Sequence, residues 1–146
     1  MKIRTMNVKD YSDICDLWLS CEGMGLNNLD ESQQGIEKFL TRNPTTCFVA
    51  EDSEHIVGGI LAGYDGRRGY IYHVALSPSH RRKGVGSALV QRALSALREE
   101  GISKTALLVF RRNEDGNAFW EREGFTQRED IVYRDKALME VVRRDT

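Results

Sequence analysis

Apolar residues recur every three or four positions in four stretches of the chain, which is the spacing of a helix with one buried face. Between these stretches lie short runs rich in apolar and β-branched residues, which predict strands. Glycine, proline and asparagine separate the runs. The expected elements, in order, are a strand at 2–6, helices at 8–18 and 31–42, strands at 46–51, 56–64 and 70–76, a helix at 85–100, a strand at 105–110, a helix at 113–123, and strands at 131–133 and 137–142.

The run at 70–76 is apolar on both faces except for His73, which predicts a central strand covered by helices on each side. The run at 85–100 is the longest helix, with apolar residues along one side and polar residues along the other. The succession of elements is mixed α/β, without a repeat, low-complexity tract or linker. Because 146 residues suit one ordinary domain, we expect a single domain over 1–146.

The composition narrows the class of protein mainly by what it excludes. The formal net charge is −1, from 21 basic and 22 acidic residues, which gives no support to a nucleic-acid or membrane-surface partner attracted by bulk charge. No apolar run is long enough to span a bilayer, and the N-terminus lacks a signal-like region, so a cytoplasmic location is expected. The three cysteines form no Cys-x-x-Cys pair, so we expect reduced thiols and no metal site.

The segment 74–87 carries the clearest chemistry. A buried strand ends at Pro78, a basic loop with two glycines follows, and an amphipathic helix begins directly after it. The first amides of a helix lack internal partners and carry partial positive charge, so they bind phosphate oxygens. Missing side chains at the glycines would let a phosphate approach the backbone closely. The cations of the loop are Arg81, Arg82 and Lys83, and the glycines are Gly84 and Gly86.

Two common phosphate-binding motifs do not fit this segment. The Walker pattern, in which Gly-Lys-Ser/Thr follows a first glycine after four residues, is absent. A dinucleotide fingerprint needs a small residue where Leu89 stands and an acidic residue at the end of the next strand, and 107–110 offers none. A nucleotide-binding regulatory domain is therefore an alternative with little support.

The run Arg81–Gly86 resembles the Gln/Arg-x-x-Gly-x-Gly/Ala signature of the GNAT superfamily of N-acetyltransferases. That family places Val-x-Pro-like residues just before the signature, as at 76–78, and an asparagine-containing helix ending in Gly-Phe after the next strand, as at 117–125. The resemblance covers nearly the whole chain. Within the family, 63–69 followed by Tyr72 is similar to a bacterial subgroup, the YpeA acetyltransferases.

The resemblance implies a GNAT fold of α/β (α+β) type, with a mixed, mostly antiparallel sheet of six to seven strands flanked by about four helices. It also implies acetyl-CoA as cosubstrate, with pantetheine paired along a strand edge, pyrophosphate held by loop amides, and the thioester in a slot where the strands at 70–76 and 105–110 splay apart. The residues implied in binding are Val74, Ala75, Leu76, Arg81, Arg82, Lys83, Gly84, Val85, Gly86, Ser87, Asn117 and Trp120.

Some of these residues have a structural alternative. Asn117 either contacts pantetheine or caps its helix, and Trp120 packs on pantetheine or in the core. The hydroxyl of Ser87 either binds phosphate or belongs to an ordinary helical turn. The pair Arg111-Arg112 either reaches the 3′-phosphate of the cosubstrate or stays at the surface.

The implied reaction is direct attack of a neutral amine on the acetyl-CoA carbonyl, so the site must accept a proton from the amine. His73 is the first candidate base because imidazole titrates near neutral pH, and the alternative is a hydrogen-bonded histidine inside a packed sheet. The loop carboxylates Glu22, Asp30 and Asp65 are further candidates to recognise or deprotonate the amine, and the alternative for each is a solvated surface charge. The family's tyrosine acid is replaced by Trp120, so either Tyr72, Tyr133 or water protonates the thiolate or the thiolate leaves unassisted.

The function expected from these residues is acetyl transfer to a primary amine of a small molecule, protein or peptide. An acyl-CoA-binding sensor or scaffold with little catalysis is the alternative from another class, because the family's tyrosine is missing. The loop at 22–30 and the strand pair at 131–142 are expected to wall the acceptor pocket. No motif encodes the identity of the acceptor or the choice between monomer and homodimer.

Overall fold

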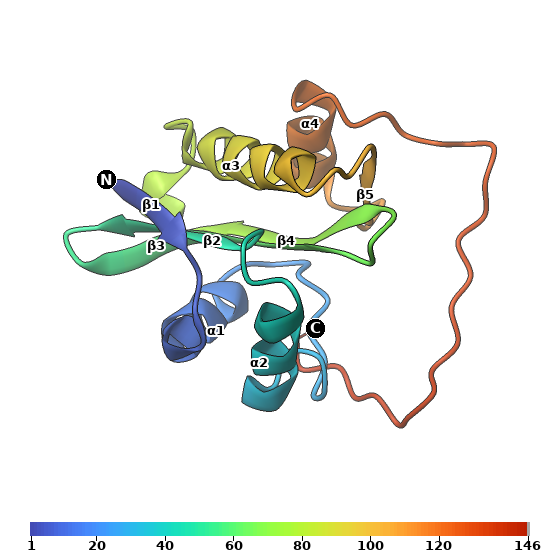
Figure 1. The fold of residues 1–146 in the computed structure, drawn as a ribbon, viewed down its shortest axis with the longest axis horizontal. Coiled ribbons are helices and arrows are strands. Elements are labelled where there is room, and N and C mark those ends of the chain that lie inside the picture. The colour runs from blue at the N-terminus through green and yellow to red at the C-terminus, as the bar shows by residue number, and fades with distance from the viewer. Residues whose placement is uncertain (146) are drawn as a thin grey trace.

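A five-stranded sheet lies between two layers of helices in the computed structural model, which describes residues 1–145 (Figure 1). Neighbouring strands are antiparallel except for the last pair, which is parallel. Across the sheet the order is β1 (Lys2–Thr5), β2 (Phe48–Asp52), β3 (His55–Tyr64), β4 (Gly69–Leu76) and β5 (Thr105–Leu107).

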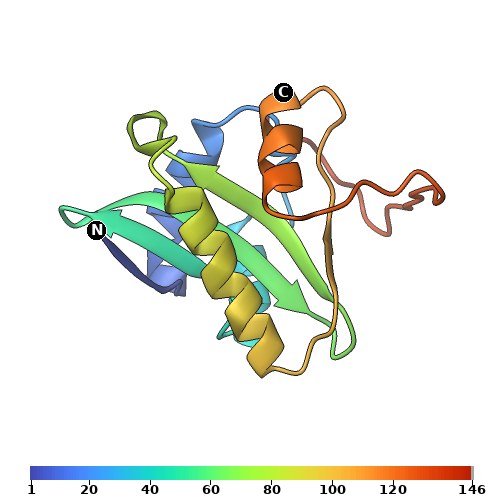
Figure 2. The ribbon, with the colours of Figure 1, turned by 90° about the horizontal axis from the view of Figure 1, so that it is seen from above.

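The helices divide between the two faces of the sheet (Figures 1 and 2). One face is covered by α1 (Tyr11–Leu19) and α2 (Gln33–Arg42), and the other by α3 (Val85–Glu99) and α4 (Glu114–Arg122). Two short 3-10 helices, η1 (Val8–Asp10) and η2 (Pro78–His80), precede α1 and follow β4. Among residues 1–145, no helix is both long and apolar enough to cross a bilayer.

The first helical segment begins at the residues that the sequence predicts. The side chain of Asn7 accepts a hydrogen bond from the backbone N–H of Lys9 (2.9 Å), and the Asp10 carboxylate accepts one from the backbone N–H of Asn7 (2.9 Å). This reciprocal arrangement is a capping box. Arg4 of β1 pairs with the same carboxylate at 2.8 Å. Asn7 is thus the N-cap of this segment, and the ion pair ties the cap to the sheet.

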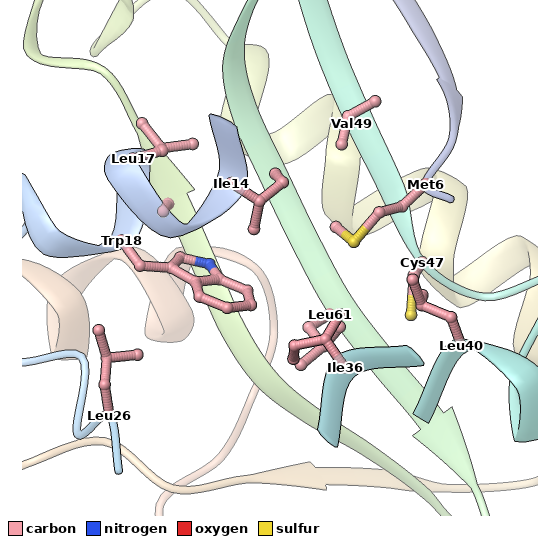
Figure 3. Packing of buried hydrophobic residues seen from close by; sticks show 11 residues of the cluster. Met6, Ile14, Leu17, Trp18, Leu26, Ile36, Leu40, Cys47, Val49 and Leu61 are labelled. Carbon is pink, nitrogen blue, oxygen red and sulfur yellow. The ribbon is translucent and has the colours of Figure 1, made fainter. Parts of the chain in front are cut away.

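Two apolar clusters fill the space on either side of the sheet. On the side of α1 and α2, the cluster surrounds Trp18, which is 1% exposed (Figure 3). On the side of α3, Leu89 and Val90 join Ile60 and Ile71 of the strands. Burying one such side chain stabilises the fold by about 1.5–3 kcal/mol. The sheet is therefore held from both faces, as the apolar run at 70–76 predicts.

A β-bulge at Tyr72 decides which face the side chains of β4 use. The register pairs Ile71 and His73 with consecutive residues of β3, so Tyr72 is an extra residue with no partner of its own. Ile71 lies in the cluster beneath α3, whereas the His73 ring lies 5.0 Å from the ring of Trp18 in α1. Strand side chains alternate between faces, so without the bulge positions 71 and 73 would share one face.

The C-terminal strands predicted at 131–133 and 137–142 do not form, so the expected six to seven strands are corrected to five. The strand predicted at 105–110 also ends early, at Leu107. After α4 the chain runs outward from the body (Figure 1), and its apolar side chains stay uncovered: Val132 is 76% and Leu138 91% exposed. Strand propensity is realised only where a neighbouring strand and a surface to pack on are available.

The end of the chain returns to the loop between α1 and α2. Asp145 accepts hydrogen bonds from the backbone N–H groups of Gly25 (3.0 Å) and Leu26 (2.8 Å). Arg144 donates to the backbone oxygen of Glu31 (2.9 Å). We call residues 142–145 the C-terminal clasp, because they hold the 25–31 loop through residues more than a hundred positions away in sequence.

Candidate functional site

The separation of β4 from β5 opens one edge of the central strand. β5 pairs with β4 only over Gly69–Ile71. Beyond that point, residues 72–76 have β3 on one side and no strand of the described chain on the other. The predicted splay of the two strands is confirmed. It leaves backbone N–H and C=O groups free to pair with an extended ligand, as an added strand would.

Beyond the free edge, after a short connection, the chain enters a helix whose N-terminus has no side-chain cap. After β4 come η2 and the basic loop (residues 81–84), in which Arg82 and Gly84 adopt φ values of +62° and +81°. Helix α3 begins with Gly84 as N-cap, and its first turn contains no acidic residue. Within residues 1–145, no side chain bonds its first amides. Those amides therefore keep their hydrogen-bonding capacity for a ligand.

The two glycines of this segment are needed for different reasons. A Cβ atom on Gly84 would meet nothing within 4 Å, so the left-handed backbone is what favours glycine there. A Cβ atom on Gly86 would lie 3.2 Å from Phe119 and 3.3 Å from Leu76. Sequence reasoning assigns both glycines to phosphate approach, but at Gly86 the close neighbours are side chains of this protein, and the glycine lets α3 pack on α4 and β4.

Three other predicted binding residues already have partners within the protein. The hydroxyl of Ser87 donates to the carboxylate of Glu123 at 2.6 Å. The Asn117 amide donates to the backbone oxygens of Phe110 (3.0 Å) and Asn113 (2.8 Å), so it braces the chain before α4. The N-cap of α4 is Asn113, not Asn117. The ring of Trp120 packs edge-on against Phe119 and Phe125, with centroids 5.0 Å away in each case.

Tyr72 and His73 are neighbours in sequence with very different surroundings. Tyr72 is 51% exposed and packs against Tyr70 and Phe39, with ring centroids at 4.6 and 5.4 Å. His73 is buried, its Nε2 lies 3.8 Å from Oε2 of Glu31, and its Nδ1 has no hydrogen-bond partner among the described residues. The bulge thus presents the phenol to solvent and holds the imidazole against α1.

Asp65 lies in the turn between β3 and β4, where its carboxylate accepts hydrogen bonds from the backbone N–H groups of Arg67 and Arg68, both at 2.8 Å. These bonds lower the pKa of Asp65, and the bond from Arg68 has the larger effect. A lowered pKa weakens a carboxylate as a proton acceptor. The residue shapes the turn and borders an open hollow of about 370 Å³ that also includes Tyr72.

The structure reveals partners that sequence reasoning missed. Glu31 meets His73, Glu123 meets Ser87, and Asp52 meets His80. In each pair the residues lie at least 28 positions apart, and no local spacing signals the contact. The segments 22–30 and 131–142, which are predicted to wall the acceptor pocket, touch where the backbone N–H of Asn28 donates to the backbone oxygen of Val142 at 2.9 Å. Neither segment lines the hollow beside Tyr72.

Comparison with known proteins agrees with this geometry. Residues 11–125 match the family model for the acetyltransferase (GNAT) family. An acetyltransferase of Sodalis glossinidius (strain morsitans) is 29% identical over 140 residues, which cover 96% of this chain and 97% of that protein. The crystal structure of Ard1 from Thermoplasma volcanium matches with a TM-score of 0.76 and 25% identity, over 86% of this chain and 82% of its own.

The PaiA N-acetyltransferase of Thermoplasma acidophilum, solved in complex with coenzyme A, matches with a TM-score of 0.74 over 86% of this chain and 89% of its own. At 17% identity it supports the fold alone. The expected GNAT fold is confirmed, and the alternative of a sensor or scaffold gains no support from relatives that are named acetyltransferases. The matched residues include the free edge of β4, the basic loop, and the helices α3 and α4. This chain belongs to the GNAT family and is an N-acetyltransferase.

Proposed function

We propose that this enzyme transfers the acetyl group of acetyl-CoA to a primary amine by direct attack. The observation that supports this most strongly is that the free β4 edge is followed, through η2 and the basic loop, by an α3 N-terminus without a side-chain cap. The two features suit the two parts of one molecule. An extended, amide-containing arm fits the strand edge, and a diphosphate fits the helix N-terminus and its basic loop.

In this proposal, backbone groups of Val74–Leu76 pair with the pantetheine arm, and the amides of residues 82–87 hold the pyrophosphate. The exposed side chains of Arg81, Arg82 and Lys83 add positive charge around it. Ser87 can join only by exchanging its hydrogen bond to Glu123 for one to a phosphate oxygen.

The chemistry requires one bond to form, one to break and one proton to move at each end. The amine nitrogen bonds to the carbonyl carbon, the carbon–sulfur bond breaks, the amine loses a proton and the thiolate gains one. A backbone N–H on the free edge of β4 is the proposed donor to the developing oxyanion. Tyr72 is the proposed proton donor to sulfur, because it stands at the start of the free β4 edge. Its partial burial, together with nearby Asp30, Tyr133 and Asp65, raises its pKa, so the phenol carries its proton at neutral pH.

The acceptor amine is proposed to enter through the hollow beside Tyr72. Its walls include the rings of Phe39, Tyr70 and Tyr72. Aromatic faces suit the hydrocarbon part of an amine and attract its positive charge before it is deprotonated. A small amine and the amine of a peptide both meet this description.

His73 is the base that the sequence predicts, but its burial against Trp18 favours a structural role. Replacing His73 by Gln separates the two roles. If His73 is the general base, its protonation makes kcat of the wild type fall at acidic pH, and this acidic fall disappears in the Gln variant. A variant whose pH–rate profile keeps the shape of the wild type assigns His73 to the packed interior.

Calorimetric titration with coenzyme A and acetyl-CoA tests the proposal. We expect binding of both, with NAD and ATP bound much more weakly, and thiol release when acetyl-CoA is mixed with an acceptor from a panel of small amines and peptides. Replacing Arg81 and Lys83 together by Glu should weaken coenzyme A binding about tenfold or more, because it reverses the charge of the loop. The matched control replaces Arg67 and Arg68 by Glu, a basic pair in the exposed β3–β4 turn. An absence of binding by the folded wild-type protein would refute the proposal.

A further inference from the structure

His80 is bonded at both of its ring nitrogens, although it lies in a short turn at the surface. Its Nδ1 lies 2.8 Å from the hydroxyl of Ser77 and 3.0 Å from that of Ser79, and its Nε2 lies 2.8 Å from the carboxylate of Asp52. Its side chain is only 17% exposed. The ring thus connects η2, which follows β4, to the end of β2.

The β2–β3 hairpin gives this contact a firm support. Asp52 pairs with His55 across a two-residue turn, and the turn residues Ser53 and Glu54 both have positive φ values, +51° and +67°. Two successive left-handed residues form the tight turn whose twist suits a hairpin. Asp52 therefore projects from the rigid end of a paired strand, and the hydrogen bond from His80 lowers the pKa of its carboxylate.

His80 directly precedes the basic loop in the chain, so its contact with Asp52 bears on the loop. The basic loop begins at the next residue, and only Arg81, Arg82 and Lys83 separate His80 from Gly84, the N-cap of α3. The far end of the loop is held by the buried α3, whose Val85 and Gly86 lie in the interior. A contact at His80 fixes the near end, so the loop is held at both ends before any ligand arrives.

We propose that His80, supported by Asp52, is a positioning residue for cosubstrate binding: it acts through η2 to hold the basic loop in the shape that receives the pyrophosphate. A loop held in its binding shape loses less entropy on binding than a mobile one. The inference rests on the proposed function, because it assigns the basic loop to the pyrophosphate. Serine, histidine and aspartate also make hydrolytic triads, in which the aspartate is buried; the 44% exposure of Asp52 favours a brace.

The test compares two ligands on the full-length protein: coenzyme A, and pantetheine, which lacks the pyrophosphate and the nucleotide. For His80→Ala we expect the Kd for coenzyme A to rise about tenfold, and the Kd for pantetheine, measured by competition, to stay within about twofold. Asp52→Ala should have the same effect, and the double variant should be little worse than either single one, because the two residues form one brace.

Two further variants keep the result interpretable. His80→Gln retains a donor toward Asp52 and should recover part of the affinity, whereas Glu54→Ala removes an exposed carboxylate from the same turn and should leave the Kd unchanged. An unchanged affinity for coenzyme A in both His80→Ala and Asp52→Ala overturns the inference. An equal loss for coenzyme A and pantetheine also overturns it, since that indicates general loosening of the fold. Wild-type protein that binds no coenzyme A overturns the proposed function as well.

Discussion

Gly84 shows how one backbone angle can matter for both stability and binding. Its φ of +81° belongs to a region that costs a residue with a Cβ atom roughly 1–2 kcal/mol. Any change of that angle also rotates the first amides of α3, which are the proposed ligands of the pyrophosphate. The chain offers a matched position, because Gly66 in the β3–β4 turn has a φ of +94° and equally open surroundings.

We therefore expect Gly84→Ala and Gly66→Ala to lower the free energy of unfolding by a similar amount, about 1 kcal/mol each. Only Gly84→Ala should weaken coenzyme A binding, by about fivefold or more. Urea unfolding and calorimetry measure the two effects. Equal coenzyme A affinity in both variants would show that the loop angle does not shape the site.

At the scale of elements, the start of η1, which leads directly into α1, depends on one carboxylate. Asp10 accepts hydrogen bonds from Arg4 and from the backbone N–H of Asn7. Burial by itself raises the pKa of Asp10, but the bonds from Arg4 and Asn7 outweigh it and the net pKa is lowered. A carboxylate whose pKa is lower in the folded than in the unfolded state stabilises the fold at pH values above the unfolded-state pKa. This contribution is lost as the pH falls through the folded-state pKa.

Replacing Asp10 by Asn should accordingly lower the free energy of unfolding by about 2 kcal/mol at pH 7. The difference from the wild type should shrink as the solution is acidified below pH 3.8, the pKa of an aspartate in the unfolded chain. Asp13→Asn, in the first turn of α1 and exposed, is the control and should change stability by less than about 1 kcal/mol. A deficit in Asp10→Asn that does not depend on pH would contradict the assignment to an ionised carboxylate.

At the scale of the whole molecule, the C-terminal clasp joins the last residues of the chain to the loop that carries Glu31. The side chain of Arg144 also approaches the sulfur of Cys15 at 3.3 Å, so the clasp reaches the interior beside α1. Between α4 and the clasp, the exposed segment makes no strand within the described residues. The α1–α2 loop is therefore held by contacts between residues more than a hundred positions apart in sequence.

Asp145→Ala should release this loop, because it removes the acceptor for two backbone N–H groups. Hydrogen exchange at Gly25 and Leu26 should become faster, and the free energy of unfolding should fall by about 1–2 kcal/mol. Glu140→Ala, which changes a carboxylate in the exposed segment, serves as the control and should alter neither. Unchanged exchange in the Asp145 variant would show that the loop is ordered without the clasp.

Local pattern was sufficient for most elements and for the basic loop. The predicted helices and strands up to residue 123 are present, with boundaries shifted by up to three residues. The basic loop could be recognised because its charges, glycines and helix start are adjacent in sequence. The C-terminal strands could not be predicted correctly, because apolar residues such as Val132 and Leu138 have strand propensity but find no neighbour to pair with or pack on.

The sequence by itself determined the order of elements, the capping box at Asn7 and the basic loop before α3, because each depends on residues within a few positions of one another. Only the tertiary structure decided that Gly86 serves helix packing, that the bulge at Tyr72 turns His73 toward Trp18, and that Asp52 meets His80. These features arise where segments distant in sequence touch. Such contacts depend on the register and twist of the whole sheet, which local spacing does not specify.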